Sequence, residues 1–110
     1  NEDIITRAEA ITRSDPLQLD AFLHARLDPS AAYNLLTRGT PASPGAVSGR
    51  IVFDGAEAEA AAGKGEQVLL VCRETTPSEV FAMQMAVGIV TSRGGPASHA
   101  ATVARGLGRP

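Results

Sequence analysis

The sequence predicts an α/β fold in which at least part of the sheet is parallel. Apolar runs with a strand-like composition occupy 50–54, 67–72 and 88–91. Segments with helical signals lie between them, at 56–62 and 77–86. Strands that alternate with helices build βαβ units, and such units place the strands parallel to one another.

Length and composition exclude several classes of protein. The 110 residues suffice for one small domain, and a hydrophobic fraction of 44% with a net charge of −2 excludes a disordered chain. No run of about 18 apolar residues occurs, so no transmembrane helix is predicted. The near-neutral charge argues against a nucleic-acid-binding domain. All but one of the ten cationic side chains are arginine, which suits carboxylate and phosphate ligands.

The first 38 residues are predicted to form a helical linker that follows a preceding domain. Apolar residues recur at helical spacing over 1–26, and Asp15-Pro16 interrupts them. We therefore expect two short helices with a break near 13–16. Proline, glycine and serine then dominate 38–50. This change of composition divides the chain into a linker, residues 1–38, and a compact domain, residues 39–110.

The first half of the compact domain is predicted to be a strand, a helix and a second strand. The strand at 50–54 precedes an alanine-rich helix at 56–62, which Gly63 ends. The apolar run at 67–72 has no polar interruption after its first residue. Such a run is typical of a strand that is buried on both faces.

The second half continues the alternation of helix and strand. Thr76 and Glu79 form a capping-box pattern with proline at the first helical position, so a helix is expected from about residue 77. A short strand at 88–91 follows, and then a helix at 98–105. Gly106 is in position to be the residue just after the end of that helix.

The stretch between the last strand and the last helix is the candidate functional site. It contains Gly94 and Gly95, followed by Ser98 and His99. Glycines at a strand-to-helix turn let backbone N–H groups approach a ligand, and the start of a helix favours an anion such as phosphate. A neutral imidazole beside such a cradle can accept a phosphoryl group covalently. On spacing alone, a histidine that caps or packs the helix is the alternative.

Three neighbouring side chains have expected roles of their own. Arg93 is expected either to pair with a transferred phosphoryl group or to form an ion pair with Glu74 or Glu79. Arg105 is expected to interact with the helix dipole. Cys72, in an apolar strand, is expected to be an inert core residue.

Residues 94–106 resemble the phosphohistidine signature of the PEP-utilising enzymes, which include pyruvate phosphate dikinase, phosphoenolpyruvate synthase and enzyme I of the sugar phosphotransferase system. The family pattern is a glycine pair, two variable residues, Ser or Cys, His, and small residues leading to Ala-Arg. Here it reads Gly-Gly-Pro-Ala-Ser-His over 94–99. Segments 19–29, 40–53 and 73–77 also resemble the dikinases, in the family's order, so the resemblance covers most of the chain.

The resemblance implies a swivelling β/β/α phosphohistidine domain preceded by a helical linker. It implies that His99 is the catalytic residue that accepts the phosphoryl group, with phosphate-binding roles for Arg93, Gly94, Gly95 and Ser98 and no metal ligand in this segment. In the dikinases, ATP, phosphate and pyruvate give AMP, pyrophosphate and phosphoenolpyruvate. The phosphohistidine passes between an ATP-binding domain and a barrel domain that binds pyruvate and phosphoenolpyruvate, both in the same chain.

Several expectations about the parent enzyme come from the resemblance. Magnesium is expected on its other domains, and this segment alone is expected to be inactive. The parent is expected to be a homo-oligomer with no nucleic-acid or membrane partner. A cytoplasmic location is expected from the resemblance, the single cysteine and the lack of a leader sequence. Because the family continues into a further strand beyond Pro110, we expect the domain to be truncated at its C-terminus, with an unpaired sheet edge there.

Two positions depart from the dikinase pattern and keep two alternatives open. Pro96 stands where methionine is often found, and proline removes one N–H donor from the cradle. Ala97 stands where the dikinases often carry a threonine that can undergo regulatory phosphorylation. The first alternative is the carrier domain of phosphoenolpyruvate synthase or another phosphohistidine transferase. The second is a non-catalytic binding domain that keeps the swivel fold.

Overall fold

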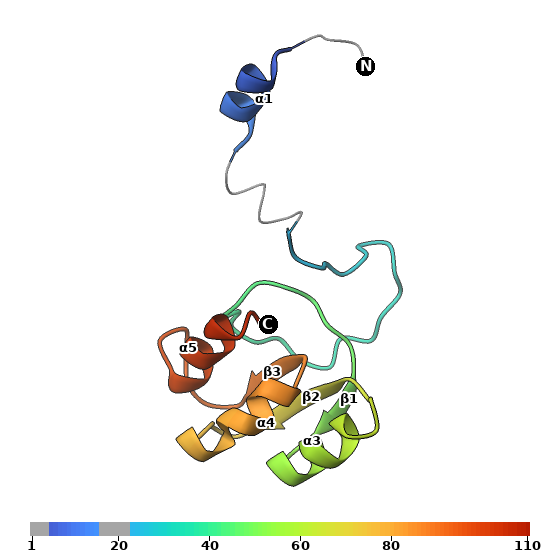
Figure 1. The fold of residues 1–110 in the computed structure, drawn as a ribbon. Helices are drawn as coiled ribbons and strands as arrows, with labels where there is room; N and C mark the ends of the chain where they lie inside the picture. The colour runs from blue at the N-terminus through green and yellow to red at the C-terminus, as the bar shows by residue number, and fades with distance from the viewer. Residues whose placement is uncertain (1–4, 16–22) are drawn as a thin grey trace.

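Three parallel strands form the sheet of this protein. The computed structural model describes residues 5–15 and 23–110. Within them the strands lie in the order β1-β2-β3 (Figure 1). Their bounds are Arg50–Val52 for β1, Val68–Cys72 for β2 and Gly88–Thr91 for β3. The predicted α/β class with a parallel sheet is therefore confirmed.

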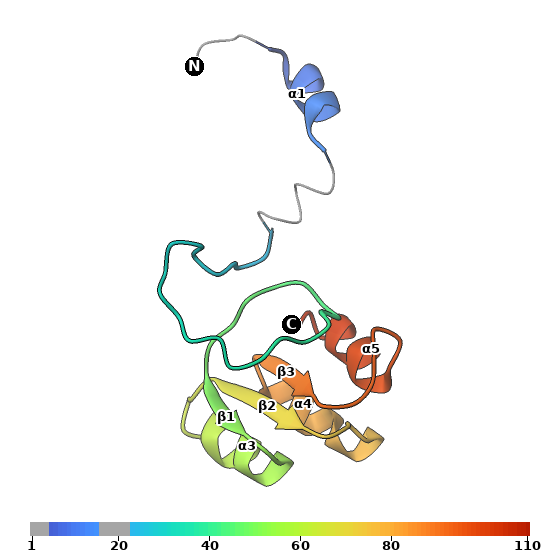
Figure 2. The same cartoon turned by 180° about the vertical axis from the view of Figure 1, so that it is seen from behind.

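Two helices of the domain pack on one face of this sheet, and a third lies beside the edge strand β3. They are α3, Gly55–Ala62, α4, Val80–Met85, and α5, His99–Gly106. A short 3-10 turn, η1 (Pro77–Glu79), leads directly into α4. Figures 1 and 2 show α3 and α4 side by side against the sheet, with α5 next to β3. No helix in the described ranges is long and apolar enough to cross a bilayer.

The core lies between the covered face of the sheet and these helices. Val52, Val68, Leu70 and Met83 are its largest fully buried side chains. The helices contribute mainly alanines, which allow a close approach to the strands. Val52 pairs with Leu70, and Leu70 with Ile89, so one row of inward-facing side chains crosses the sheet.

In the part of the chain that the structure describes, the opposite face of the sheet has no helix packed on its centre, and residues 37–43 lie over only part of it, beside Val71 and Val90. Ile51 and Val90 are 49% and 51% exposed, and Val71 is only partly buried. The expectation that 67–72 is buried on both faces is therefore wrong. Only alternate side chains of this strand, Val68 and Leu70, are fully buried under the helices. The side chains between them point to the opposite face of the sheet.

Local hydrogen bonds set the ends of two elements differently from the prediction. Strand β1 ends at Val52, because the Phe53 N–H donates to the Glu57 carboxylate at 3.0 Å and Asp54 becomes the N-cap of α3. Helix α5 continues through Gly106, so the predicted terminating role of that residue is wrong. Gly108 has the positive φ, +63°, two residues later.

The linker contains one described helix. Helix α1, Arg7–Arg13, has a capping box formed by Thr6 and Glu9 and buries no side chain. The second helix predicted in 1–26 falls mainly on 16–22, outside the described residues. The division of the chain at residue 38 stays a prediction.

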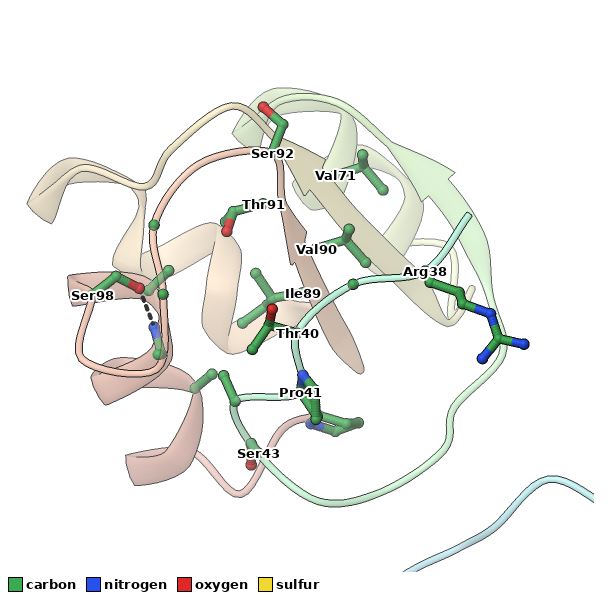
Figure 3. A pocket seen from close by; sticks show the side chains of 18 of the residues that line it. Arg38, Thr40, Pro41, Ser43, Val71, Ile89, Val90, Thr91, Ser92 and Ser98 are labelled. Carbon is green, nitrogen blue, oxygen red and sulfur yellow. Dashed lines mark hydrogen bonds between the residues drawn. The ribbon is translucent and has the colours of Figure 1, made fainter. Parts of the chain in front are cut away.

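A segment of the chain without regular structure lies against the domain beside β3 and α5. We call residues 37–45 the strap (Figure 3). A Cβ on Gly45 would lie 3.4 Å from the Pro110 side chain. The Ile89 N–H also donates to the Pro110 carbonyl at 2.9 Å. The edge of β3 that faces away from β2 thus forms a backbone hydrogen bond with Pro110.

Candidate functional site

The candidate site lies at the carboxyl edge of the sheet, where β2 and β3 end side by side. The Ser92 N–H donates to the Cys72 carbonyl at 3.0 Å, and the Arg93 N–H donates to the Arg73 carbonyl at 2.9 Å. These bonds hold the two following loops together beyond the last strand residues. In open α/β sheets this edge is where ligands bind.

A glycine turn joins β3 to α5. Gly94 has a φ of +101°, and a Cβ at this position would lie 2.9 Å from the Cβ of Ser98. Both features require glycine. The Ser98 N–H donates to the Gly95 carbonyl at 2.9 Å. The turn therefore closes tightly and leads straight into the first residue of α5.

His99 is the first residue of α5, and its side chain is exposed. Ser98 is the N-cap, with its hydroxyl accepting from the Ala101 N–H at 3.3 Å. His99 thus neither caps the helix nor packs in the core. The N–H groups of His99 and Ala100 have no acceptor among the described residues, as is usual in a first helical turn. The arrangement places an accessible imidazole next to two free donors.

Arg93 is exposed at the same turn and has no acidic partner in the described part of the chain. The ion pair expected with Glu74 or Glu79 is not formed there. The recorded ion pair joins Arg50 to Glu66 at 3.2 Å, on β1 and the loop before β2. The guanidinium of Arg93 is thus available for an anion brought to the turn.

Two side chains near the end of β2 are shielded from solvent. Thr75 is 5% exposed, and its hydroxyl has no hydrogen-bond partner. Burial raises the pKa of the Cys72 thiol, and the nearby Glu79 carboxylate raises it further. The thiol is therefore held in its neutral form, which suits a packing role.

A groove lies between the strap, β3 and α5 (Figure 3). Gly94, Gly95 and Ser98 line one end of it, and Thr40 of the strap faces Ile89 within it. His99 is not among its lining residues. The groove therefore adjoins the glycine turn but not the imidazole.

Arg105 links the strap, the glycine turn and α5, which the sequence did not predict. Its Nη1 donates to the Pro96 carbonyl at 2.7 Å and to the Ala42 carbonyl at 3.1 Å. The acceptors are nine and 63 positions away along the chain. Both are backbone carbonyls, which any residue type provides, so no sequence pattern signals the contact.

Potential metal ligands do not gather in the described ranges. No group of three or more His, Cys, Asp or Glu side chains there is placed to hold an ion. The chemistry that the site offers is that of an imidazole, backbone N–H donors and an exposed guanidinium.

Residues 64–110 match the family model of the PEP-utilising enzyme mobile domain. The matched segment begins just after α3, continues through β2, α4 and β3 to α5, and includes the whole glycine turn.

Individual relatives extend the similarity to nearly the whole chain. A pyruvate, phosphate dikinase of Rhizobium meliloti is 49% identical over 109 residues, which is 99% of this chain and 12% of the relative. The enzyme of the same name from Clostridium symbiosum is 46% identical over 110 residues, covering 98% and 13%. That of Entamoeba histolytica is 46% identical over 109 residues, covering 99% and 12%. The chain thus spans about an eighth of the length of the curated relatives it matches.

Proposed function

The chain belongs to the PEP-utilising enzymes through the mobile domain in residues 64–110, and on this premise we propose that it is the phosphoryl-carrier segment of a pyruvate, phosphate dikinase-like enzyme. His99 is the residue that carries the phosphoryl group. One observation supports this most directly: an exposed imidazole stands at the start of α5, immediately after a glycine turn, beside N–H groups without acceptors.

The chemistry of the site suits a carrier. A lone pair on an imidazole nitrogen forms the N–P bond while the bond from phosphorus to its leaving-group oxygen breaks. The free N–H groups of His99 and Ala100, the helix dipole and the Arg93 guanidinium offset the charge on the phosphoryl oxygens during transfer. In the second half-reaction the N–P bond breaks, the phosphoryl group passes to the oxygen of the acceptor, and the neutral imidazole returns.

The acceptor and donor sites of this proposal lie outside the chain. ATP and phosphate react at an ATP-binding domain, and pyruvate becomes phosphoenolpyruvate at a barrel domain. The relatives' length, about eight times the matched segment, leaves room for both. Magnesium belongs to those other domains in this proposal, as the resemblance to the dikinases implies. The segment alone is then inactive.

The remaining parts of the proposal concern the parent enzyme. Residues 39–110 swivel between the two distant sites, and residues 1–38 form the connection on which they turn. The parent is a cytoplasmic homo-oligomer. These assignments rest on the family to which the chain belongs.

Labelling of the full-length parent enzyme tests the proposal. The enzyme is incubated with ATP labelled in its β-phosphoryl group, phosphate and magnesium, quenched at alkaline pH, and mapped by peptide mass spectrometry. We expect acid-labile label on His99. We also expect His99→Ala to remove the label without lowering the melting temperature, because the substituted side chain is exposed and alanine favours a helix.

The chain contains a matched control. Its other histidine, His24, lies in the linker, so His24→Ala should label as wild type does. Folded wild-type enzyme that binds ATP but carries no label on His99 would refute the carrier role. It would favour a non-catalytic binding domain instead.

A further inference from the structure

We propose that Arg105 is a positioning residue for phosphoryl transfer, which holds the peptide between Pro96 and Ala97 in place and seats the strap against the same turn. The proposal rests on the carrier role of His99. Arg105 touches neither the imidazole nor, in this proposal, the phosphoryl group. It acts through the backbone that leads to His99.

Arg105 fixes the direction of one peptide group in the turn. Its Nη1 donates to the Pro96 carbonyl at 2.7 Å, a short bond from a charged donor. None of the described peptide bonds is cis, so the Ala97 N–H points opposite to that carbonyl. This N–H has no acceptor in the described part of the chain. By holding the Pro96 carbonyl, Arg105 therefore fixes the direction of the Ala97 N–H, which points away from the Arg105 side chain.

This donor matters more here because Pro96 has no N–H of its own. The turn from Gly94 to His99 is short of one donor for phosphoryl oxygens. The Ala97 N–H is the next donor along the backbone. A peptide that is free to rotate would present it only part of the time, whereas a pinned peptide presents it continuously, which is the condition for preorganised stabilisation.

Arg105 also contacts the strap. The other hydrogen on Nη1 reaches the Ala42 carbonyl at 3.1 Å. One nitrogen thus joins the turn before His99 to the segment that enters the domain from the linker. When the strap leaves this position, Arg105 loses one of its two acceptors, and the turn loses part of its support. The seating of the strap and the geometry at His99 are coupled through this side chain.

Arg105 is well suited to a positioning role because it contributes little to the core. Its side chain is exposed, and it has no acidic partner among the described residues. The neighbouring alanine, Ala104, is the one that packs into the domain. Removing the guanidinium should therefore loosen the turn and the strap with little effect on the free energy of unfolding of the domain.

The test compares Arg105→Met, Arg105→Lys and Arg50→Met in the full-length parent enzyme. The rate of label transfer from ATP to His99 is measured by rapid quench, and limited trypsin digestion is followed by mass spectrometry. Trypsin cleaves after Arg38 in the strap and after Arg26 outside it. Arg50→Met removes another exposed arginine, whose recorded partner is Glu66.

We expect Arg105→Met to lower the labelling rate at least tenfold, about the loss that one charge-assisted hydrogen bond represents. Arg105→Lys should restore most of the rate, since an ammonium can donate to the same carbonyls. Cleavage after Arg38 should become faster in Arg105→Met, whereas cleavage after Arg26 should not change. Arg50→Met should match wild type in both measurements.

Labelling at the wild-type rate in folded Arg105→Met, or unchanged cleavage after Arg38, would overturn the proposal. If Arg105→Met does not fold, Arg105→Gln, which keeps an NH₂ donor, replaces it under the same criteria. Failure of this inference is distinct from failure of the carrier role. If only this inference fails, the wild-type enzyme and Arg105→Met both acquire label on His99 at the same rate. If the carrier role fails, the wild-type enzyme acquires no label on His99.

Discussion

Gly94 and Gly95 are adjacent, but the structure gives them different constraints. Gly94 has a φ of +101° and lies against Ser98, whereas a Cβ on Gly95 would meet no atom within 4 Å. Gly94 is therefore needed for the shape of the turn. Gly95 is not required by the shape of the turn, because a side chain there would extend into open space.

This difference predicts the stability of two single variants. Gly94→Ala should lower the free energy of unfolding by about 1–3 kcal/mol, because alanine is strained at this φ and its Cβ would collide with Ser98. Gly95→Ala, the matched control, should lower it by no more than about 0.5 kcal/mol. Urea denaturation of both variants measures the difference, and equal midpoints would contradict the turn geometry.

At the scale of elements, helix α4 shows how one short helix is tied to the sheet. It begins through the capping box of η1, in which the Thr76 N–H donates to the Glu79 carboxylate at 2.7 Å. Met83 faces the core and is fully buried, while Phe81, two positions earlier, is 57% exposed. The larger aromatic side chain thus contributes less to folding than the methionine.

Two alanine substitutions in α4 test this assignment. Met83→Ala should lower the free energy of unfolding by about 2–5 kcal/mol, because it leaves a cavity between the helix and the sheet. Phe81→Ala should change it by less than about 1 kcal/mol, since most of that ring is already in water. Denaturation midpoints compare the two. If Phe81→Ala lowers the free energy of unfolding more than Met83→Ala does, the assignment of the Met83 face of α4 to the core is wrong.

At the scale of the whole molecule, the open face of the sheet is its most unusual surface. Parallel sheets are normally covered on both faces. In the described part of this chain α3 and α4 cover one face, and Ile51, Leu69, Val71 and Val90 form adjacent rows on the other. The strap lies over part of this face, but Ile51 and Val90 leave apolar surface in contact with solvent.

We expect the 110-residue chain to bind an apolar fluorescent dye at this face. The double substitution of Ile51 and Val90 by threonine should lower the dye fluorescence by roughly half, because threonine keeps the strand propensity and reduces the apolar surface. Leu36→Thr is the control, since Leu36 is 88% exposed but lies in the segment before the strap. Equal fluorescence in all three proteins would show that the dye binds elsewhere.

Local patterns were sufficient to predict most elements of the fold. The alanine-rich run ended by Gly63 became α3, the apolar runs became β2 and β3, and the capping box at Thr76 began the segment that forms α4. Each of these signals acts over a few residues, so it survives in any tertiary context. The errors at β1 and Gly106 arose at element ends, where cap hydrogen bonds competed with the element.

The position of His99 at the beginning of a helix was also predictable from the sequence. Serine is a preferred N-cap, so Ser98 after the glycine pair marks the next residue as the first of a helix. The role of His99 as phosphoryl carrier remains a prediction. The unpaired Arg93 was one of two possibilities that the sequence allowed, and only the positions of the surrounding carboxylates decided between them.

The order and type of the elements, and the glycine turn that precedes His99, were thus set by the sequence alone, because short-range sterics and capping bonds govern both. Only the tertiary structure decided which face of β2 is covered, where the strap lies, and that Arg105 joins Ala42 to Pro96. These features depend on contacts between distant segments and on backbone carbonyls that every residue shares. A sequence pattern carries no record of such contacts.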